Sequence, residues 1–340
     1  MRLFSSRTVP IDIALRALAI IMVVFNHAGA QAGRPFELGG GIGILLLLNG
    51  YSLARFAFSA DTAPAVRQRL WQFAINLLLP CLAIVLISFA AKGAFSWSEL
   101  FFVSNWFRYD HISILYTWYP QVFLQVLAIL FLLFCIPGFA PLFFRNRFAV
   151  TLALLALSTA TLFISLRYFY NPALGHRLPH FLIWQMLAGS ALYFLLQHPD
   201  TRKVWCRLLA MAVLGTIMYF NWEPDDGILR LATFLFGLAA LLFVDRLVLW
   251  QPLARAVFIV SQAAFVIFLL HAFTLGIFGV AVPAYGDHFN VTLTTLAFLF
   301  TMLVATGYWL AWTAFATTMR RRLAAGQASG MATVGVPRTA

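Results

Sequence analysis

The sequence predicts an all-α integral membrane protein of about ten transmembrane helices, with both termini in the cytoplasm. Three observations lead to this prediction: the composition of the chain, its succession of apolar segments and the placement of its arginines. Of the 340 residues, 62% are hydrophobic and only 10% are charged. An ordinary soluble domain carries about 25% charged residues, and this chain has no polar stretch long enough to form one. We therefore expect a single membrane domain over residues 1–322.

Hydropathy predicts where the helices lie. With breaks at proline, glycine and charge clusters, the chain divides into apolar segments of membrane-crossing length. In chain order these segments are residues 8–29, 41–58, 71–91, 116–136, 148–165, 181–196, 204–219, 228–244, 256–278 and 291–317. The aromatic stretch 96–115 indicates an excursion along the membrane interface rather than a further crossing. Residues 323–340 are rich in Ala, Gly, Ser and Thr and predict a disordered cytoplasmic tail.

The basic residues predict the orientation. With the N-terminus in the cytoplasm, 16 of the 23 lysines and arginines fall in cytoplasmic loops and ends, 6 fall in outer loops, and Arg16 lies within the membrane. This bias follows the positive-inside rule, by which basic loops stay in the cytoplasm. The net charge of +12 is spread over short loops in the same way, so it indicates membrane topology and argues against a nucleic-acid partner.

Arg16 and His27 are the first residues with a chemical signal. Both lie in the first apolar segment, eleven residues apart, which is about three helical turns and roughly 16 Å along one face. Ionisable groups inside a membrane are costly and usually mark a functional interior. Asp12, one turn before Arg16, is placed to form an ion pair that lowers the cost of burying the guanidinium. The alternative for Arg16 is a side chain that extends to the inner headgroups.

His271 and two glutamines are predicted at the depth of His27, in the outer half of the membrane. His271 lies in the ninth segment, and Gln121 and Gln125 share a face at the start of the fourth. A neutral imidazole accepts a proton near pH 7, which suits a general base, and the glutamines are placed to bind an acceptor hydroxyl. The alternatives are a structural histidine bonded to a backbone carbonyl, and glutamines that serve interhelical packing.

Arg67 and Arg69 precede the third segment on the predicted cytoplasmic side. They suit the phosphates of a cytosolic ligand, and they also fit the role of topology charges. The sequence has no Walker loop, G-x-S-x-G elbow, H-E-x-x-H pair or dinucleotide fingerprint. Nearly all of its 11 acidic residues lie outside the apolar segments, so a carboxylate relay for ion coupling is poorly supported. No metal site is expected.

Together these residues resemble the membrane-bound acyltransferase-3 family, the bacterial O-acyltransferases of cell-surface glycans. The first segment resembles the family's opening pattern LDxLRxLAI, and the spacing of Arg16 and His27 matches its Arg-x10-His hallmark. The other matching stretches are residues 39–51, 67–69, 118–125, 177–181 and 261–271. Two positions depart from the pattern. Gln121 stands where many members carry an acidic residue, and Asn76 where a second arginine often precedes the helix proline.

The resemblance implies transfer of an acyl group, usually acetyl, from a cytosolic acyl-CoA to a hydroxyl of a surface or lipid-linked glycan. The reaction would take place in the bacterial cytoplasmic membrane, with the acceptor at its outer face. His27 is then expected to act as general base or acyl relay, and Arg16 to stabilise the oxyanion or the donor's pyrophosphate. The remaining expected site residues are Arg67 and Arg69 at the donor, and His271, Trp118, Gln121 and Gln125 at the acceptor.

Acetyl-CoA or another acyl-CoA is expected as a substrate, not as a bound cofactor, and glycan-assembly proteins are expected partners besides the lipid bilayer. A second class of function stays open: a transporter or flippase that moves a glycan-lipid or small metabolite without chemistry. Inverted repeats and spans broken by glycine or proline would favour it, and neither is clear in this sequence. A non-catalytic scaffold in an envelope-assembly complex is the third alternative.

Overall fold

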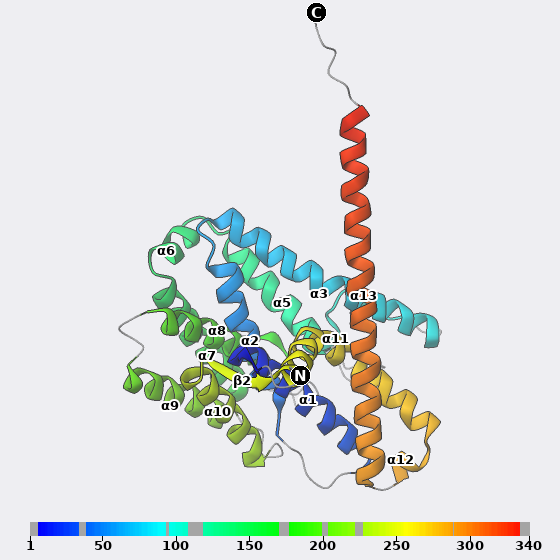
Figure 1. The fold of residues 1–340 in the computed structure, drawn as a ribbon. Coiled ribbons are helices and arrows are strands. Elements are labelled where there is room, and N and C mark those ends of the chain that lie inside the picture. Colours follow the sequence, from blue (N-terminus) through cyan, green and yellow to red (C-terminus); the bar gives the residue numbers. More distant parts are fainter. Residues whose placement is uncertain are drawn as a thin grey trace, which may run out of the picture.

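The protein is a bundle of apolar helices (Figure 1). The computed structural model describes residues 6–33, 39–92, 95–107, 118–169, 177–198, 203–221, 227–287 and 289–333. Within these residues, seven helices are long and apolar enough to cross a membrane, and three shorter apolar helices accompany them. Each apolar segment predicted from the sequence coincides with one of these helices. The prediction of an all-α, multi-pass membrane protein is therefore confirmed, while its orientation in the membrane stays a prediction.

Most of the elements are long helices joined by short connections. In chain order they are β1 (Ser6–Pro10), α1 (Ile11–Gln31), α2 (Gly41–Leu53), α3 (Ala63–Lys92), α4 (Trp97–Leu100), α5 (Trp118–Leu133), α6 (Phe139–Arg145), α7 (Arg147–Tyr168), α8 (Pro179–Gln197), α9 (Val204–Phe220), α10 (Gly227–Phe243), β2 (Arg246–Trp250), α11 (Gln251–Ala281), α12 (Ala284–Asp287) and α13 (Val291–Thr333). A π-helical turn, Ala54–Phe58, continues α2. Up to residue 107, the stretch predicted as an interfacial excursion holds only α4 and a 3₁₀ turn, Ser104–Trp106.

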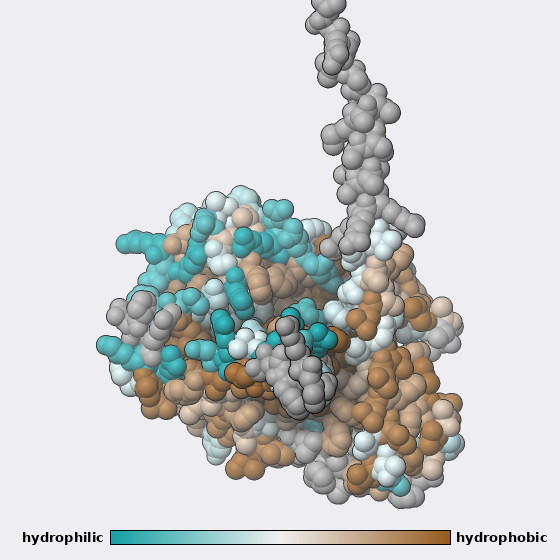
Figure 2. All heavy atoms as spheres, viewed as in Figure 1, coloured by the Kyte–Doolittle hydropathy of each residue, from teal (hydrophilic) through white to brown (hydrophobic). Residues whose placement is uncertain are grey.

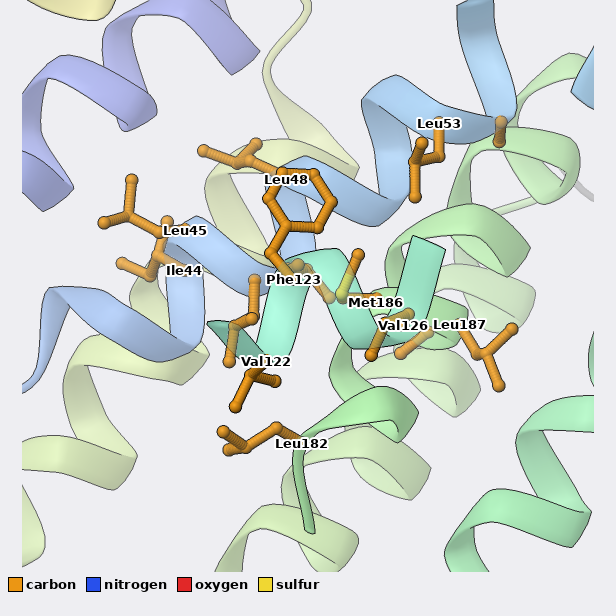
Figure 3. Packing of buried hydrophobic residues seen from close by; sticks show 14 of the residues in the cluster. Ile44, Leu45, Leu48, Leu53, Val122, Phe123, Val126, Leu182, Met186 and Leu187 are labelled. Carbon is orange, nitrogen blue, oxygen red and sulfur yellow. The ribbon is translucent and has the colours of Figure 1, made fainter. Parts of the chain in front are cut away.

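Helices α2 and α8 form the centre of the bundle. In the apolar window of each, 72% of the residues are buried, against 22% in α13. The run from Ile42 to Leu48 makes α2 apolar on every side, and a helix that is hydrophobic all round is buried rather than exposed on one face. Its side chains pack with Val122 of α5 and with Leu182 and Met186 of α8 (Figure 3).

Two glycines allow the backbones of α2 and α8 to approach closely. A Cβ atom at Gly189 of α8 would lie 1.8 Å from the carbonyl oxygen of Leu47, and one at Gly50 of α2 would lie 1.7 Å from that of Met186. The hydroxyl of Ser190 donates to the carbonyl oxygen of Gly50 over 2.8 Å. Small residues at helix crossings are a common means of close packing in membranes, so these positions fix the spacing of the two central helices.

Helices α1, α11 and α13 pack against one another beside this centre. Thr274 of α11 donates to Thr301 of α13 over 3.1 Å. The Tyr285 hydroxyl, on α12, donates to the carbonyl oxygen of Ala28 near the end of α1 over 2.6 Å. Burial raises the pKa of Tyr285 to about 12, so its hydroxyl keeps the proton that it donates. Figure 2 shows hydrophobic residues over α12 and the adjoining part of α13, and hydrophilic ones gathered around α6.

A two-stranded antiparallel ribbon was not predicted from the sequence. It joins β1 to β2, with pairs from Ser6–Trp250 to Pro10–Arg246. Strand β1 leads directly into α1, and β2 leads directly into α11. The amide of Ile11 donates to the carbonyl oxygen of Asp245 over 3.1 Å, which ties the start of α1 to this ribbon. Hydropathy gives no local signal for two five-residue strands that lie about 240 residues apart in the chain.

The C-terminal part of α13 differs from expectation. The helix runs to Thr333, whereas the sequence predicted disorder from residue 323. Residues 323–333 include several alanines, which favour a helix, and extending an existing helix avoids the cost of nucleation. Residues 334–340 of the predicted tail lie outside the described residues.

Candidate active site

The structure brings together the two histidines that the sequence placed at one depth. The ring centroids of His27 and His271 are 4.7 Å apart, with their planes at 66°. This contact arises because α1 and α11 pack along each other. His271 is fully buried, and His27 is partly exposed. An ionisable pair at a helix contact inside the membrane is the strongest candidate for chemistry in this fold.

Both rings carry their proton on the same nitrogen. The Nδ1 of His27 lies 2.8 Å from the carbonyl oxygen of Val23, and the Nδ1 of His271 is bonded to that of Phe268. A carbonyl oxygen only accepts, so Nδ1 is the donor in each neutral ring and Nε2 holds the lone pair. The helices thus fix the tautomer in which Nε2 is the atom that accepts a proton.

Arg16 is held by α2. Its Nη2 donates to the Ser52 hydroxyl over 2.7 Å and to the carbonyl oxygen of Leu48 over 3.5 Å. Its Nε is buried and has no hydrogen-bond partner among the residues that the structure describes. The expected pair of Arg16 with Asp12 is replaced by a different ion pair, in which Arg55 of the π-helical turn approaches Asp12 to 3.4 Å. Because the guanidinium of Arg16 bonds to Leu48 and Ser52 of α2, it lies against the protein interior.

Tyr119 and Asn49 are polar residues of this interior to which the sequence assigned no role in the site, although Asn49 lies in the matching stretch 39–51. The side-chain amide of Asn49 donates to the Tyr119 hydroxyl over 2.6 Å. Tyr119 is buried and interacts electrostatically with Arg16. The only signal in the sequence was the position of Tyr119 between Trp118 and Pro120, next to Gln121.

An aromatic contact joins the arginine end of the site to the histidine end. The Tyr119 ring lies 4.5 Å from the Phe268 ring, centroid to centroid. Phe268 in turn lies 5.2 Å from the ring of His271. These ring contacts therefore connect Tyr119 of α5 to His271 of α11 and, through it, to His27 of α1.

Gln121 and Gln125 hold the segment before α5. Gln121 accepts from the Asn105 backbone amide over 2.9 Å and donates to the Ser104 hydroxyl over 2.6 Å. Gln125 donates to the carbonyl oxygen of Phe102 over 2.8 Å and exchanges side-chain hydrogen bonds with Asn105. Both glutamines therefore hold the position of residues 102–106, whereas the alternative left open by the sequence was packing between helices.

Trp118 lies beside these residues at the start of α5. Its ring is 6.5 Å from that of Phe268, and the guanidinium of Arg177 lies 5.9 Å from the Trp118 ring. The contact with Phe268 connects Trp118 to the line of side chains that ends at the histidines. Of the remaining histidines, His180 and His198 lie at the two ends of α8, and His176 and His288 lie outside the described residues.

Arg67 and Arg69 both bind backbone. Arg67 donates to the carbonyl oxygen of Phe134 at the end of α5 over 3.2 Å, and Arg69 to that of Phe56 over 2.9 Å. Arginines near helix ends commonly bond to the last carbonyls in this way. Through these bonds, Arg67 holds α3 against the end of α5, and Arg69 holds α3 against the π-helical turn.

A different set of arginines lines a cavity of about 430 Å³ at the start of α1. We call this cavity the arginine pocket and define it by Arg55, Arg207 and Arg246. It also contains Asp12, Asp245 and two tyrosines, Tyr51 and Tyr193. The sequence did not predict it, because its walls come from α1, the π-helical turn, α8, α9, α10 and β2.

The fold and this site define a class: a helical, multi-pass membrane protein with an arginine and a histidine pair in its apolar interior. Comparison with known protein families finds an acyltransferase domain over residues 12–312. The chain belongs to the membrane-bound acyltransferase-3 family, and it is an acyltransferase of groups other than aminoacyl groups. The resemblance drawn from its sequence is thereby confirmed. No curated protein and no solved structure matches the chain.

Proposed function

We propose that this acyltransferase moves an acyl group, such as acetyl, from cytosolic acyl-CoA to a hydroxyl of a cell-surface or lipid-linked glycan. The observation that carries the proposal is the His27–His271 pair, in which both Nδ1 atoms are bound to carbonyl oxygens and His27 shares a face of α1 with Arg16. Such a pair supplies a base inside the membrane, and the arginine supplies a positive charge on the path of an anionic donor.

His27 acts as the general base in this proposal. Its Nε2 takes the proton of the acceptor hydroxyl, whose oxygen attacks the acyl carbon. The new oxygen–carbon bond forms, the carbon–sulfur bond of the thioester breaks, and the proton passes to the leaving thiolate. In the alternative sequence, His27 itself carries the acyl group between donor and acceptor. His271 contacts the His27 ring and positions it in both.

Arg16 acts at another point of the path, because about 16 Å separates it from His27 along α1. We propose that its guanidinium stabilises the negative charge of the donor's pyrophosphate while the thioester reaches His27. Ser52 fixes the direction of this guanidinium. Trp118, Gln121 and Gln125 contribute by holding α5 and residues 102–106 beside the histidines.

The loop charges favour an orientation that places the Arg16 end in the cytoplasm and the histidine end outside. We propose the bacterial cytoplasmic membrane as the location, with glycan-assembly proteins as partners that deliver the acceptor. In this orientation the donor is used from the side where acyl-CoA is made, and the acceptor is modified on the side where surface glycans mature.

Mass spectrometry of surface glycans from cells that produce wild type or His27→Ala tests this function. We expect a drop of about a hundredfold or more in acylation, the scale of general acid–base catalysis. His198→Ala is the matched control, because this exposed histidine at the end of α8 lies outside the site. Full acylation by well-folded His27→Ala would contradict the role of His27. If wild type adds no acyl group and instead changes the amount of glycan-lipid outside, the flippase alternative is favoured.

A further inference from the structure

The arginine pocket has a size and a net positive charge that suit a phosphorylated ligand, since three arginines outnumber the two aspartates, Asp12 and Asp245, in its lining. Its volume of about 430 Å³ lies within the roughly 300–1,000 Å³ of ordinary small-molecule sites. It lies at the ends of several helices: α1 and α9 begin at it, and α8 and α10 end at it. The starts of α1 and α9 carry the positive ends of their helix dipoles, which favour an anion there.

The three arginines differ in how far they are already engaged. Arg55 is paired with Asp12 at 3.4 Å. Arg207 donates through Nη1 to the carbonyl oxygen of Leu242 over 2.8 Å, and its Nε has no partner among the described residues. Arg246 is exposed, and within the described part of the chain no hydrogen bond or ion pair engages its side chain. Two guanidinium groups therefore keep donors for a ligand.

We propose that the arginine pocket binds the phosphates of the acyl-CoA donor, with Arg246 and Arg207 as the phosphate-binding residues. This assignment rests on the proposed function. A guanidinium binds phosphate through two parallel N–H donors. Arg246, the first residue of β2, lines the pocket and can bind phosphate in this way. The edge-to-face pair of Tyr51 and Tyr193, with centroids 5.3 Å apart, supplies an aromatic surface for the nucleotide base.

The position of the pocket supports this assignment over Arg67 and Arg69. Tyr51 lines the pocket, and its neighbour Ser52 holds the guanidinium of Arg16. In this proposal, a donor whose phosphates lie in the pocket extends its thioester arm toward Arg16 and the histidines. Arg67 and Arg69, in contrast, bind carbonyl oxygens of Phe134 and Phe56 and do not line the pocket.

Binding measurements on the full-length protein in nanodiscs of neutral lipid test the proposal, with coenzyme A and adenosine 3′,5′-bisphosphate as the probes. We expect Arg246→Gln to weaken the binding of both by about tenfold, the effect of losing one charge-assisted contact. Arg246→Lys restores part of this loss because it keeps the charge. Arg207→Lys serves as a second variant, which keeps the positive charge and loses the paired N–H donors of the guanidinium. Arg255→Gln is the matched control, an exposed arginine in the first turns of α11 that does not line the pocket.

Three results would overturn the assignment, and they are distinguishable. If Arg246→Gln and Arg207→Lys bind coenzyme A as wild type does while Arg67→Gln loses binding, the donor site is at α3 and the proposed function stands. If anionic lipid displaces the bisphosphate from the pocket but leaves coenzyme A bound, the pocket holds a lipid headgroup. If wild type binds neither probe, both the pocket assignment and the use of an acyl-CoA donor are wrong.

Discussion

Replacing Gly189 by alanine tests the close packing of α2 on α8. The new Cβ would lie 1.8 Å from the carbonyl oxygen of Leu47 and 2.8 Å from the amide nitrogen of Tyr51. Ordinary carbon–oxygen contacts are about 3.3 Å long, so the two helices would have to part by about 1.5 Å, the difference between these lengths. Both colliding atoms belong to the backbone, and no change of side-chain rotamer relieves the contact. Parting the helices also weakens the hydrogen bond from Ser190 to Gly50.

The expected destabilisation is about 3 kcal/mol, from overpacking of about 1–3 kcal/mol and a lost hydrogen bond of about 1 kcal/mol. The assay is thermal unfolding of the purified protein, followed by tryptophan fluorescence and by the monodisperse fraction in size-exclusion chromatography. Gly276→Ala is the matched control, because its Cβ meets no atom within 4 Å and alanine favours the helix α11. The packing argument is refuted if Gly189→Ala unfolds at the same temperature as Gly276→Ala.

Two further predictions concern single hydroxyl groups. Tyr119→Phe removes the acceptor of the Asn49 amide, and we expect a loss of about 1–3 kcal/mol in stability. We also expect slower acyl transfer at unchanged donor binding. Equal turnover by wild type and Tyr119→Phe would show that the phenol has no part in the path. Tyr285 has its pKa raised to about 12 from an ordinary value of about 10, so its contribution to stability is complete below pH 10 and is lost as the pH rises through 12. Melting temperatures measured from pH 8 to 12 should fall more steeply for wild type than for Tyr285→Phe, and parallel curves would contradict the linkage.

The helices could be predicted from the sequence because each is encoded locally. A run such as Ile44–Leu48 is apolar on every side, so hydropathy alone both locates α2 and predicts that it is buried. The ribbon of β1 and β2 could not be predicted, because the pairing joins two short strands that lie about 240 residues apart in the chain. The π-helical turn after Leu53 also lies inside a predicted segment without interrupting its hydropathy.

The candidate site likewise contains residues that local sequence signals revealed and residues that only the fold reveals. Arg16 and His27 were found because helical periodicity places both on one face of one helix, and His271 was found because an ionisable residue is rare in an apolar segment. Tyr119 was missed because a tyrosine in such a segment is not unusual. Arg246 and Arg207 were assigned to topology, since only the folded chain brings β2, α9 and α1 to one cavity.

The ribbon has a consequence for the histidine pair, because both helices that carry it start from the ribbon, α1 at the Pro10–Arg246 end and α11 at the Ser6–Trp250 end. Counted from the end of the ribbon, His27 is about 24 Å along α1 and His271 about 30 Å along α11, at 1.5 Å per residue. The ladder of β1 with β2 fixes the two starting points against each other, so it also sets the axial alignment of the two imidazoles. One residue inserted after Pro10 would move His27 by about 1.5 Å and turn it by about 100° relative to His271. The five residue pairs of the ribbon thus determine how the two imidazoles, about 24 and 30 Å away along their helices, meet each other.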